Sequence, residues 1–173
     1  VVTGSRAEYG LLYWVLHELR AAVDVELQLV VTGMHLAPEF GLTVREIERD
    51  GFTIARRVDM LLSGDTPAAN AKSIGLGVIG LSDALESLAP DLLLVLGDRF
   101  EILAAVQAAL VHNIPVAHIA GGDTTEGAFD EAIRHSITKM AHLHLVTNEL
   151  AARRVRQLGG VAGRERALQE QRR

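Results

Sequence analysis

The chain has 173 residues, with 17 Lys and Arg against 22 Asp and Glu, and it contains no cysteine. This length suits one well-buried domain, and the missing cysteines exclude disulfides and thiolate chemistry from the chain. The excess of acidic over basic residues argues against a surface that binds nucleic acid. The sequence shows neither a signal peptide nor an apolar run long enough to cross a membrane, so we expect a cytoplasmic protein.

The chain opens on the end of a strand at Val1 and Val2, followed by a glycine turn and a helix from Ser5. Free backbone N–H groups at such a helix start favour an anion, so the turn is a candidate phosphate site. Arg6 would add donors to it, although an arginine at a helix start, taken alone, is more often simply solvated. The three-glycine dinucleotide fingerprint is missing, so a nicotinamide cofactor is not indicated.

The second predicted strand, residues 25–31, leads to a histidine. His35 follows the strand end closely, either as a functional residue or as a loop histidine bonded to the backbone. Thr43 and Glu46 have capping-box spacing and predict the start of a short helix. Residues 53–58 are predicted as the third strand.

A long helix is predicted from Pro67 to about residue 88, with Gly75, Gly77 and Gly80 inside it. Each glycine costs roughly 1 kcal/mol relative to alanine in a helix interior. The cluster therefore indicates either a close approach to another element or a break in the helix.

The centre of the chain carries the strongest strand signal. The apolar run at residues 92–96 is too short for a membrane span and is typical of a strand buried on both faces of a parallel sheet. Gly97, Asp98 and Arg99 then turn the chain into a helix that begins near Phe100. Ligands of open α/β sheets lie at the carboxyl ends of the strands, which makes Asp98 and Arg99 candidate site residues.

The same pattern repeats with a strand at residues 116–119, the pair Gly121 and Gly122, and a helix from about Phe129. Two carboxylates held near each other can work as base and acid, because their environments push their pKa values apart. Each acid taken alone is equally compatible with a helix cap. The two loops bring six charged residues toward one sheet edge: Asp98, Arg99, Asp123, Glu126, Asp130 and Glu131.

Residues 142–146 form a last short strand, and Asn148 is placed to cap a helix over residues 149–158. Six strands alternating with helices predict an α/β fold, a single Rossmann-like domain with a parallel sheet of about six strands. The common strand order for six such units is 3-2-1-4-5-6.

Three other kinds of chemistry lack their signatures. His142 and His144 lie on one face of a strand, but no His-Glu-x-x-His pattern accompanies them, so we expect no metal. A Gly-x-Ser-x-Gly nucleophile elbow and a P-loop are also missing from the sequence.

Four runs in order closely resemble the hydrolysing UDP-N-acetylglucosamine 2-epimerases of sialic-acid-type sugar synthesis. They are TGSRAEYG at residues 3–10, TGMHLAPEFG at 32–41, GDRFE at 97–101 and DEAIRHSITK at 130–139. The likeness covers residues 1 to about 158. Several motifs in the right order make it far more specific than any single one.

The resemblance implies a GT-B fold, in which two Rossmann-like halves enclose the active site. Residues 1–158 would be the N-terminal half, and residues 159–173 a basic tail that departs from the family, with the C-terminal domain absent. The family converts UDP-N-acetylglucosamine and water to N-acetylmannosamine and UDP, through elimination of UDP and hydration of a glycal. No redox cofactor is implied. The expected partners are a UDP-sugar and the missing half, while assembly into a homo-oligomer stays open.

Family motifs assign residue roles by position. Asp98, Asp130 and Glu131 are the implied catalytic residues. The implied substrate-binding residues are Arg6, His35, Arg99, Asp123, Glu126, Arg134 and His135.

One position departs from the family pattern. Many members have His-Ile-Glu-Gly-Gly, and this chain has Ala120 in place of the glutamate. Either Asp123 or Glu126 takes over the base role, or the substrate is a related UDP-diacetamido-trideoxyhexose, or the protein is inactive. Two other hypotheses for the function are half of a GT-B glycosyltransferase and a non-catalytic α/β module. We expect the chain alone to turn over little or no substrate.

Overall fold

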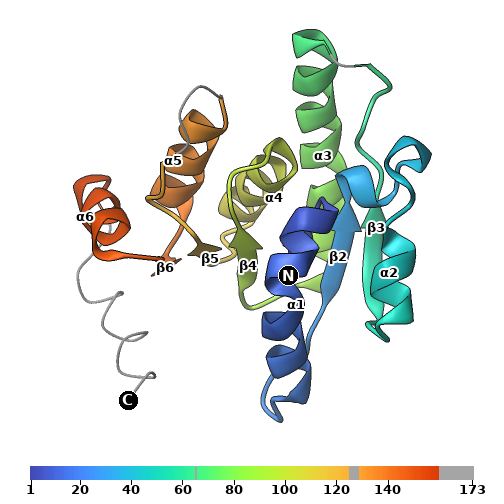
Figure 1. The fold of residues 1–173 in the computed structure, drawn as a ribbon, viewed down its shortest axis with the longest axis horizontal. Coiled ribbons are helices and arrows are strands. Elements are labelled where there is room, and N and C mark those ends of the chain that lie inside the picture. Colours follow the sequence, from blue (N-terminus) through green and yellow to red (C-terminus); the bar gives the residue numbers. More distant parts are fainter. Residues whose placement is uncertain (65, 125–128, 160–173) are drawn as a thin grey trace.

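The computed structural model describes residues 1–64, 66–124 and 129–159, which alternate between strands and helices (Figure 1). The strands are β1 (Val2–Thr3), β2 (Leu29–Thr32), β3 (Ile54–Val58), β4 (Leu93–Leu96), β5 (Val116–Ile119) and β6 (Leu143–Leu145). The α-helices are α1 (Arg6–Ala21), α2 (Val44–Arg49), α3 (Pro67–Leu88), α4 (Phe100–Val111), α5 (Asp130–Met140) and α6 (Glu149–Gln157). Two 3-10 turns, η1 (Gly33–His35) and η2 (Pro38–Phe40), connect β2 to α2.

All strand pairs are parallel, as expected for strands joined by helical crossovers. The hydrogen-bonded order is β1-β2-β3 in one ladder and β4-β5-β6 in another, so the predicted order holds within each ladder. Strands β1 and β4 are in contact, but no ladder joins them in the described residues. The prediction of one continuous six-stranded sheet is therefore wrong at this seam, where β1 extends over only two residues.

The two faces of the strands bury separate apolar clusters. Leu29 and Val31 of β2 pack with α1 and α2, whereas Val30 between them joins the cluster under α3, α4 and α5. This alternation follows from the two-residue period of a strand. Figure 1 shows α1 in front of the strands and α4 behind them. The cluster under α3, α4 and α5 includes residues of β1, β2, β3 and β4, so this cluster spans both ladders.

Helix starts follow local capping rules at α3 and α6. Asn148 accepts a hydrogen bond from the Ala151 N–H at the start of α6, as predicted, and Thr66 caps α3 with Pro67 in its first turn. The expected capping box of Thr43 is wrong, because its side chain makes no cap bond to α2. The Thr43 hydroxyl instead lies 2.8 Å from a ring nitrogen of His35.

Predicted strands are longer than the observed ones. The second was expected over residues 25–31, but β2 starts at Leu29 because Val25 is solvent-exposed and residues before Leu29 find no ladder partner. The strands expected over residues 53–58, 92–96 and 142–146 each lose terminal residues in the same way. The strand at residues 116–119 is confirmed.

The glycines of α3 reflect close packing, since the helix is continuous through all three. A Cβ atom on Gly80 would lie 2.6 Å from Cγ1 of Val58, and one on Gly77 would lie 3.0 Å from Cβ of Ala104. Gly75 has no atom within 4 Å of such a Cβ and is exposed. Two of these glycines thus let α3 approach β3 and α4.

No helix in the described ranges has both the length and the hydrophobicity that crossing a membrane requires.

We predict opposite effects for two Gly-to-Ala changes in α3. Gly75→Ala should raise the free energy of unfolding by about 0.5–1 kcal/mol, because it adds helix propensity without a contact. Gly80→Ala should lower it by about 1–3 kcal/mol, because the stiff Val58 side chain must move. Chemical denaturation of both variants measures the difference. Equal effects would contradict the packing explanation.

Candidate active site

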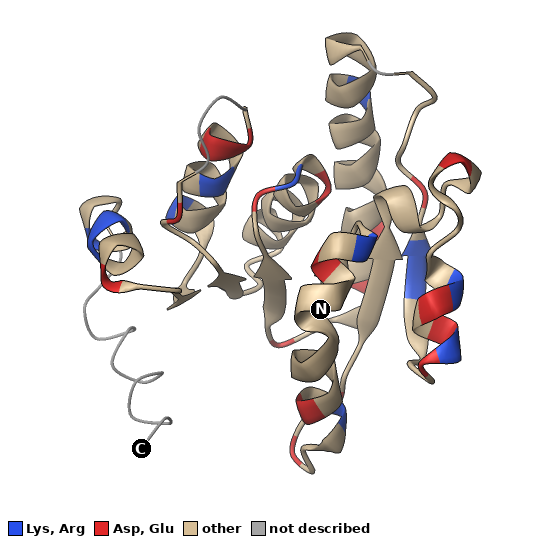
Figure 2. Ribbon diagram, in the orientation of Figure 1, with Lys and Arg blue, Asp and Glu red and all other residues tan. Residues whose placement is uncertain are grey.

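Charged residues gather at the carboxyl ends of the central strands. Figure 2 shows acidic and basic segments next to one another in the loop after β4 and in the first turns of α5. This edge includes the point between β1 and β4 where the strand order reverses. Open α/β sheets bind ligands at such switch points.

A buried ion pair closes the seam between the two ladders. The Glu101 side chain in α4 has no exposed surface, and both of its oxygens accept hydrogen bonds from Arg99, at 2.9 and 3.1 Å. Glu101 packs against Gly4 after β1 and Gly33 after β2, where a Cβ atom would lie 2.9 and 2.7 Å from its carbons. Gly33 also has a φ of +58°, which favours glycine. Arg99 further reaches the sulfur of Met34 at 3.5 Å.

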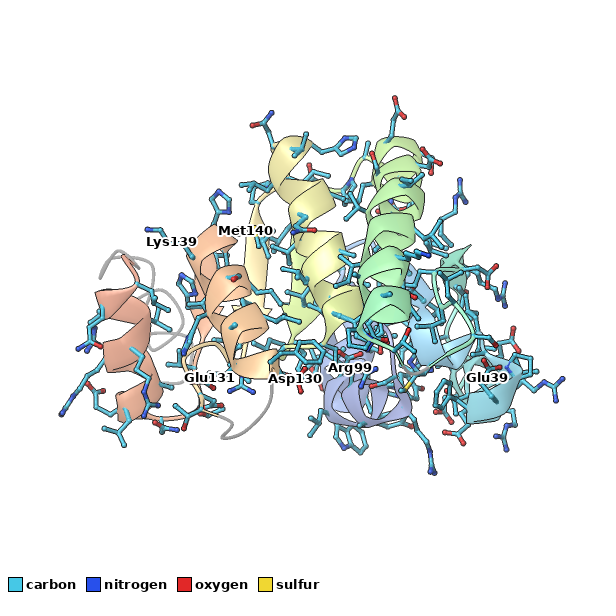
Figure 3. The ribbon with its side chains drawn as sticks, turned by 90° about the horizontal axis from the view of Figure 1, so that it is seen from above. Glu39, Arg99, Asp130, Glu131, Lys139 and Met140 are labelled. Carbon is cyan, nitrogen blue, oxygen red and sulfur yellow. The ribbon has the colours of Figure 1, made fainter. Side chains whose placement is uncertain are left out.

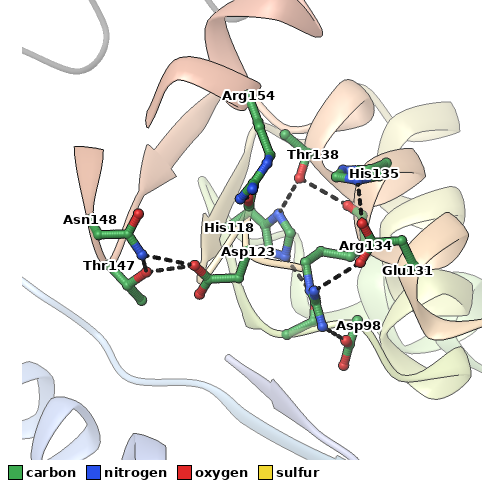
Figure 4. Close-up of polar contacts among 12 residues, drawn as sticks. Asp98, His118, Asp123, Glu131, Arg134, His135, Thr138, Thr147, Asn148 and Arg154 are labelled. Carbon is green, nitrogen blue, oxygen red and sulfur yellow. Dashed lines mark hydrogen bonds and ion pairs between the residues drawn. The ribbon is translucent and has the colours of Figure 1, made fainter. Parts of the chain in front are cut away.

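Asp98 pairs with an arginine from another element. Arg134 of α5, itself nearly buried, forms an ion pair with the Asp98 carboxylate and contacts Glu131 at 3.4 Å (Figure 4). Glu131 also lies 3.0 Å from the ring of His135 one turn on. Burial lowers the pKa of Arg134. The structure thus joins four predicted residues into one chain of contacts.

Asp130 joins the same cluster from the start of α5. Its carboxylate is among the negative charges that raise the pKa of Arg99: burial alone would lower this pKa, but the Glu101 hydrogen bonds and the nearby carboxylates outweigh it. Figure 3 shows Asp130 and Arg99 next to each other below α4. Within the described part of the chain, Asp130 forms no side-chain hydrogen bond or ion pair, and it is only partly buried.

Arg6 and His35 lie outside this cluster. The exposed Arg6 side chain pairs with Glu46 of α2 at 3.1 Å. The His35 ring is fully buried, and its nitrogens lie 3.1 Å from the Thr3 hydroxyl and 2.8 Å from that of Thr43. Burial lowers the pKa of His35 to about 4, so the ring is neutral. These contacts fit a structural part in holding the loop after β2. The ring interacts with the backbone of Ser5, as one interpretation of His35 expected, and also with two side-chain hydroxyls.

The loop after β5 holds the remaining predicted acids. Asp123 accepts hydrogen bonds from Thr147 at 2.7 Å and Asn148 at 3.3 Å, which ties the loop to the start of α6 (Figure 4). Glu126 lies outside the described residues. Ala120 directly follows β5 and has a left-handed φ of +63°, a conformation that costs energy for a residue with a Cβ. Its methyl group offers no acid–base chemistry.

Sequence reasoning missed Glu8. Its Oε2 accepts hydrogen bonds from the backbone N–H of Gly4 at 2.8 Å and of Ser5 at 3.0 Å. The capping box at the start of α1 therefore occupies N–H groups that were expected to bind an anion, which corrects that expectation for these two groups. Ser-x-x-Glu spacing at residues 5–8 is the signal that could have found it.

Within the described ranges, no group of three His, Cys, Asp or Glu residues is arranged to hold a metal ion.

A Rossmann-like α/β domain carries its ligand-binding residues at the carboxyl ends of the strands, beside the point where the strand order reverses. The family model for UDP-N-acetylglucosamine 2-epimerase matches residues 17–164. The chain therefore belongs to the UDP-N-acetylglucosamine 2-epimerase family.

Curated relatives agree with this membership. The chain is 45% identical over 159 residues to a GDP/UDP-N,N'-diacetylbacillosamine 2-epimerase (hydrolyzing) of Campylobacter jejuni, covering 92% of this chain and 41% of that protein. It is 43% identical over 158 residues to the UDP-N,N'-diacetylbacillosamine 2-epimerase (hydrolyzing) of Legionella pneumophila, covering 91% and 42%. A UDP-N-acetylglucosamine 2-epimerase of Neisseria meningitidis is 36% identical, with 91% and 41% covered. The chain thus spans about two fifths of these relatives.

Solved structures share the fold. A UDP-GlcNAc 2-epimerase from Neisseria meningitidis bound to UDP-GlcNAc superposes with a TM-score of 0.80 at 21% identity, over 94% of this chain and 44% of that one. The Methanocaldococcus jannaschii enzyme in complex with UDP-GlcNAc and UDP gives 0.81 at 19% identity, over 94% and 44%. The fold corresponds to the N-terminal half of a GT-B fold.

We predict that Glu8→Gln stabilises the chain in a pH-dependent way. Burial raises the pKa of Glu8 to about 7, and the nearby Glu101 adds to this rise. The folded chain then holds the proton more tightly than the unfolded one, so this carboxyl costs stability progressively as pH rises from about 4.5 through 7. Relative to the original chain, Glu8→Gln should gain up to about 3 kcal/mol at pH 8 and almost nothing at pH 4.

Urea denaturation at both pH values measures this difference. Exposed Glu86→Gln on α3 is the matched control and should change stability little at either pH. A Glu8→Gln chain that is equally destabilised at both pH values would contradict the interpretation.

Proposed function

We propose that this chain is the N-terminal half of a hydrolysing UDP-sugar 2-epimerase, with residues 1–158 forming the Rossmann-like half. A second half would complete the substrate site. The observation that carries the proposal is the cluster of Asp98, Arg134, Glu131 and Asp130 at the carboxyl ends of the strands, on a chain of this family. Carboxylates are the groups that can remove and return a proton at a sugar carbon.

The proposed reaction has two steps. A base removes the proton at C2, the C1–O bond breaks, and UDP leaves with the bonding electrons, which gives a glycal. Water then adds its hydroxyl to C1 and gives its remaining proton to a carboxylate, while an acid delivers a proton to C2 from the opposite face. The net result is the free 2-epimerised sugar and UDP.

Two carboxylates suit these steps. Arg134 beside Asp98 favours the ionised form, which fits the base. Asp130 lies outside that ion pair and is the proposed acid, which takes up a solvent proton before it delivers one to C2. Glu131 contacts both Arg134 and His135, and we assign it the role of positioning these two side chains. This division gives the two acids different environments, which is what acid–base pairs require. It also provides for the base role without a glutamate at Ala120.

Arg6 is the proposed contact for the UDP diphosphate. Its guanidinium is exposed, and among the described residues it pairs with Glu46 at the surface. Surface pairs of this kind contribute about 0–1 kcal/mol, so a diphosphate can replace Glu46 as partner.

We propose a UDP-N,N'-diacetylbacillosamine as substrate, with UDP-N-acetylglucosamine as the alternative. The first name belongs to relatives at 45% and 43% identity, and the second to one at 36%. Comparing kcat/KM for the two UDP-sugars with the full-length protein decides between them.

The full-length protein should release UDP from its UDP-sugar and, in heavy water, carry solvent deuterium at C2 of the free product. Asp98→Asn should lower kcat by roughly a hundredfold or more, as expected for the loss of a positioned acid or base. Asp91→Asn, an exposed acid before the amino end of β4, is the control and should leave kcat unchanged. Deuterium at C2 is read by NMR.

Two results would contradict this proposal. Release of UDP without deuterium at C2 would exclude the elimination mechanism. Release that depends on an added acceptor sugar, with C2 unlabelled, would instead establish a glycosyltransferase of the same fold.

We further predict that residues 1–173 alone turn over the UDP-sugar at least about a hundredfold more slowly than the full-length protein, because substrate contacts outside the chain contribute to the transition state. Circular dichroism should show that the shortened chain is folded. Equal rates for the two proteins would show that this half suffices.

A further inference from the structure

The turn before Asp98 is held by β5 through both of its backbone groups. The N–H of Gly97 donates to the Ile119 carbonyl at 3.0 Å. The Gly97 carbonyl lies 2.7 Å from Nε2 of His118, which must be the donor because a carbonyl only accepts. Gly97 has a φ of +80°, so this turn depends on a conformation that few other residues adopt.

The second ring nitrogen of His118 faces α5. Its Nδ1 lies 3.3 Å from the hydroxyl of Thr138, and the same hydroxyl lies 2.9 Å from the carbonyl oxygen of Arg134, one turn earlier (Figure 4). Burial lowers the pKa of His118 to about 4, so the neutral ring donates through Nε2. Its Nδ1 is an acceptor that shares the single hydroxyl proton of Thr138 with the Arg134 carbonyl. One imidazole therefore bonds toward both elements that carry the Asp98–Arg134 pair.

The surroundings leave this ring no room to move. His118 is fully buried, and it lies opposite His144 in the pairing of β5 with β6. A Cβ on Gly121 would lie 2.9 Å from His118 Nδ1 and 3.0 Å from the Thr138 hydroxyl. The backbone at Gly121 thus closes directly over the His118–Thr138 contact.

We propose that His118 is a positioning residue for the epimerase reaction: it fixes the turn that carries Asp98 and, through Thr138, the helical turn that carries Arg134. This inference rests on the proposed function, because it acts through the proposed base. The Asp98–Arg134 ion pair joins residues 36 positions apart. It therefore depends on the turn at Asp98 and the first turns of α5 keeping their relative positions. His118 supplies one rigid link between them, and it touches no substrate.

The test compares two replacements of His118 in the full-length protein. His118→Leu removes both contacts and should lower kcat about ten- to a hundredfold, with KM changed less than about threefold. His118→Gln can still donate to the Gly97 carbonyl and should recover part of that loss. His112→Gln, which alters a histidine bonded to Ser82 at the far end of α4, is the matched control and should leave kcat unchanged.

The pH profile separates positioning from general damage. A carboxylate that loses its ion-pair partner binds a proton more tightly, so the acidic limb of kcat/KM should move to higher pH in His118→Leu. Thr138→Val should do the same to a smaller extent, and Thr138→Ser should not. These Thr138 variants decide the question if His118→Leu does not fold.

Three outcomes bear on the proposal. An unchanged kcat and acidic limb in His118→Leu and Thr138→Val would overturn it. A loss expressed only in KM would also overturn it. If the original protein shows no epimerase activity, the proposed function fails, and crystal structures of the two variants still test the link: Asp98 should leave Arg134, and an intact pair would overturn the inference.

Discussion

The organisation of this domain depends on the fully buried carboxylate of Glu101. Glu101 lies in the seam between two parallel ladders, bonded to Arg99 and enclosed by the glycine turns after β1 and β2. Removing one partner of such a buried pair leaves an uncompensated charge, which typically costs 3–5 kcal/mol. The pair therefore fixes where α4 begins relative to β1. Since Arg99 follows Asp98 directly, the same constraint fixes the candidate base.

The other residues of the candidate site lie next to this seam, on the loop after β4 and on α5. Asp98 meets Arg134 because α5 crosses back over β5, and the first turn of α5 carries Asp130 toward Arg99. Charges of both signs are thus held by elements that the strand order brings together. A site on rigid strand ends keeps acids in fixed positions, and preorganised groups of this kind act more strongly than mobile ones. Membership of the 2-epimerase family is the basis for proposing a reaction at this site.

Local signals in the sequence predicted much of this fold. The apolar run before Gly97 and the helix starts at Thr66 and Asn148 depend on neighbouring residues, and they were predicted correctly. Contacts between distant residues were not predictable. Thr43 bonds to His35 in place of its own helix, and Glu8 takes the N–H groups expected to bind an anion. Sequence patterns placed the acids at the right edge, but could not show that Arg134 pairs with Asp98.

The central claim is that Asp98 and Asp130 act on the sugar carbon C2. A crystal structure of the full-length protein with its UDP-sugar bound tests this claim most directly. The account predicts C2 within about 3.5 Å of one of the two carboxylates, with the other toward the opposite face of the ring. A sugar bound with both carboxylates more than about 6 Å from C2 would contradict it.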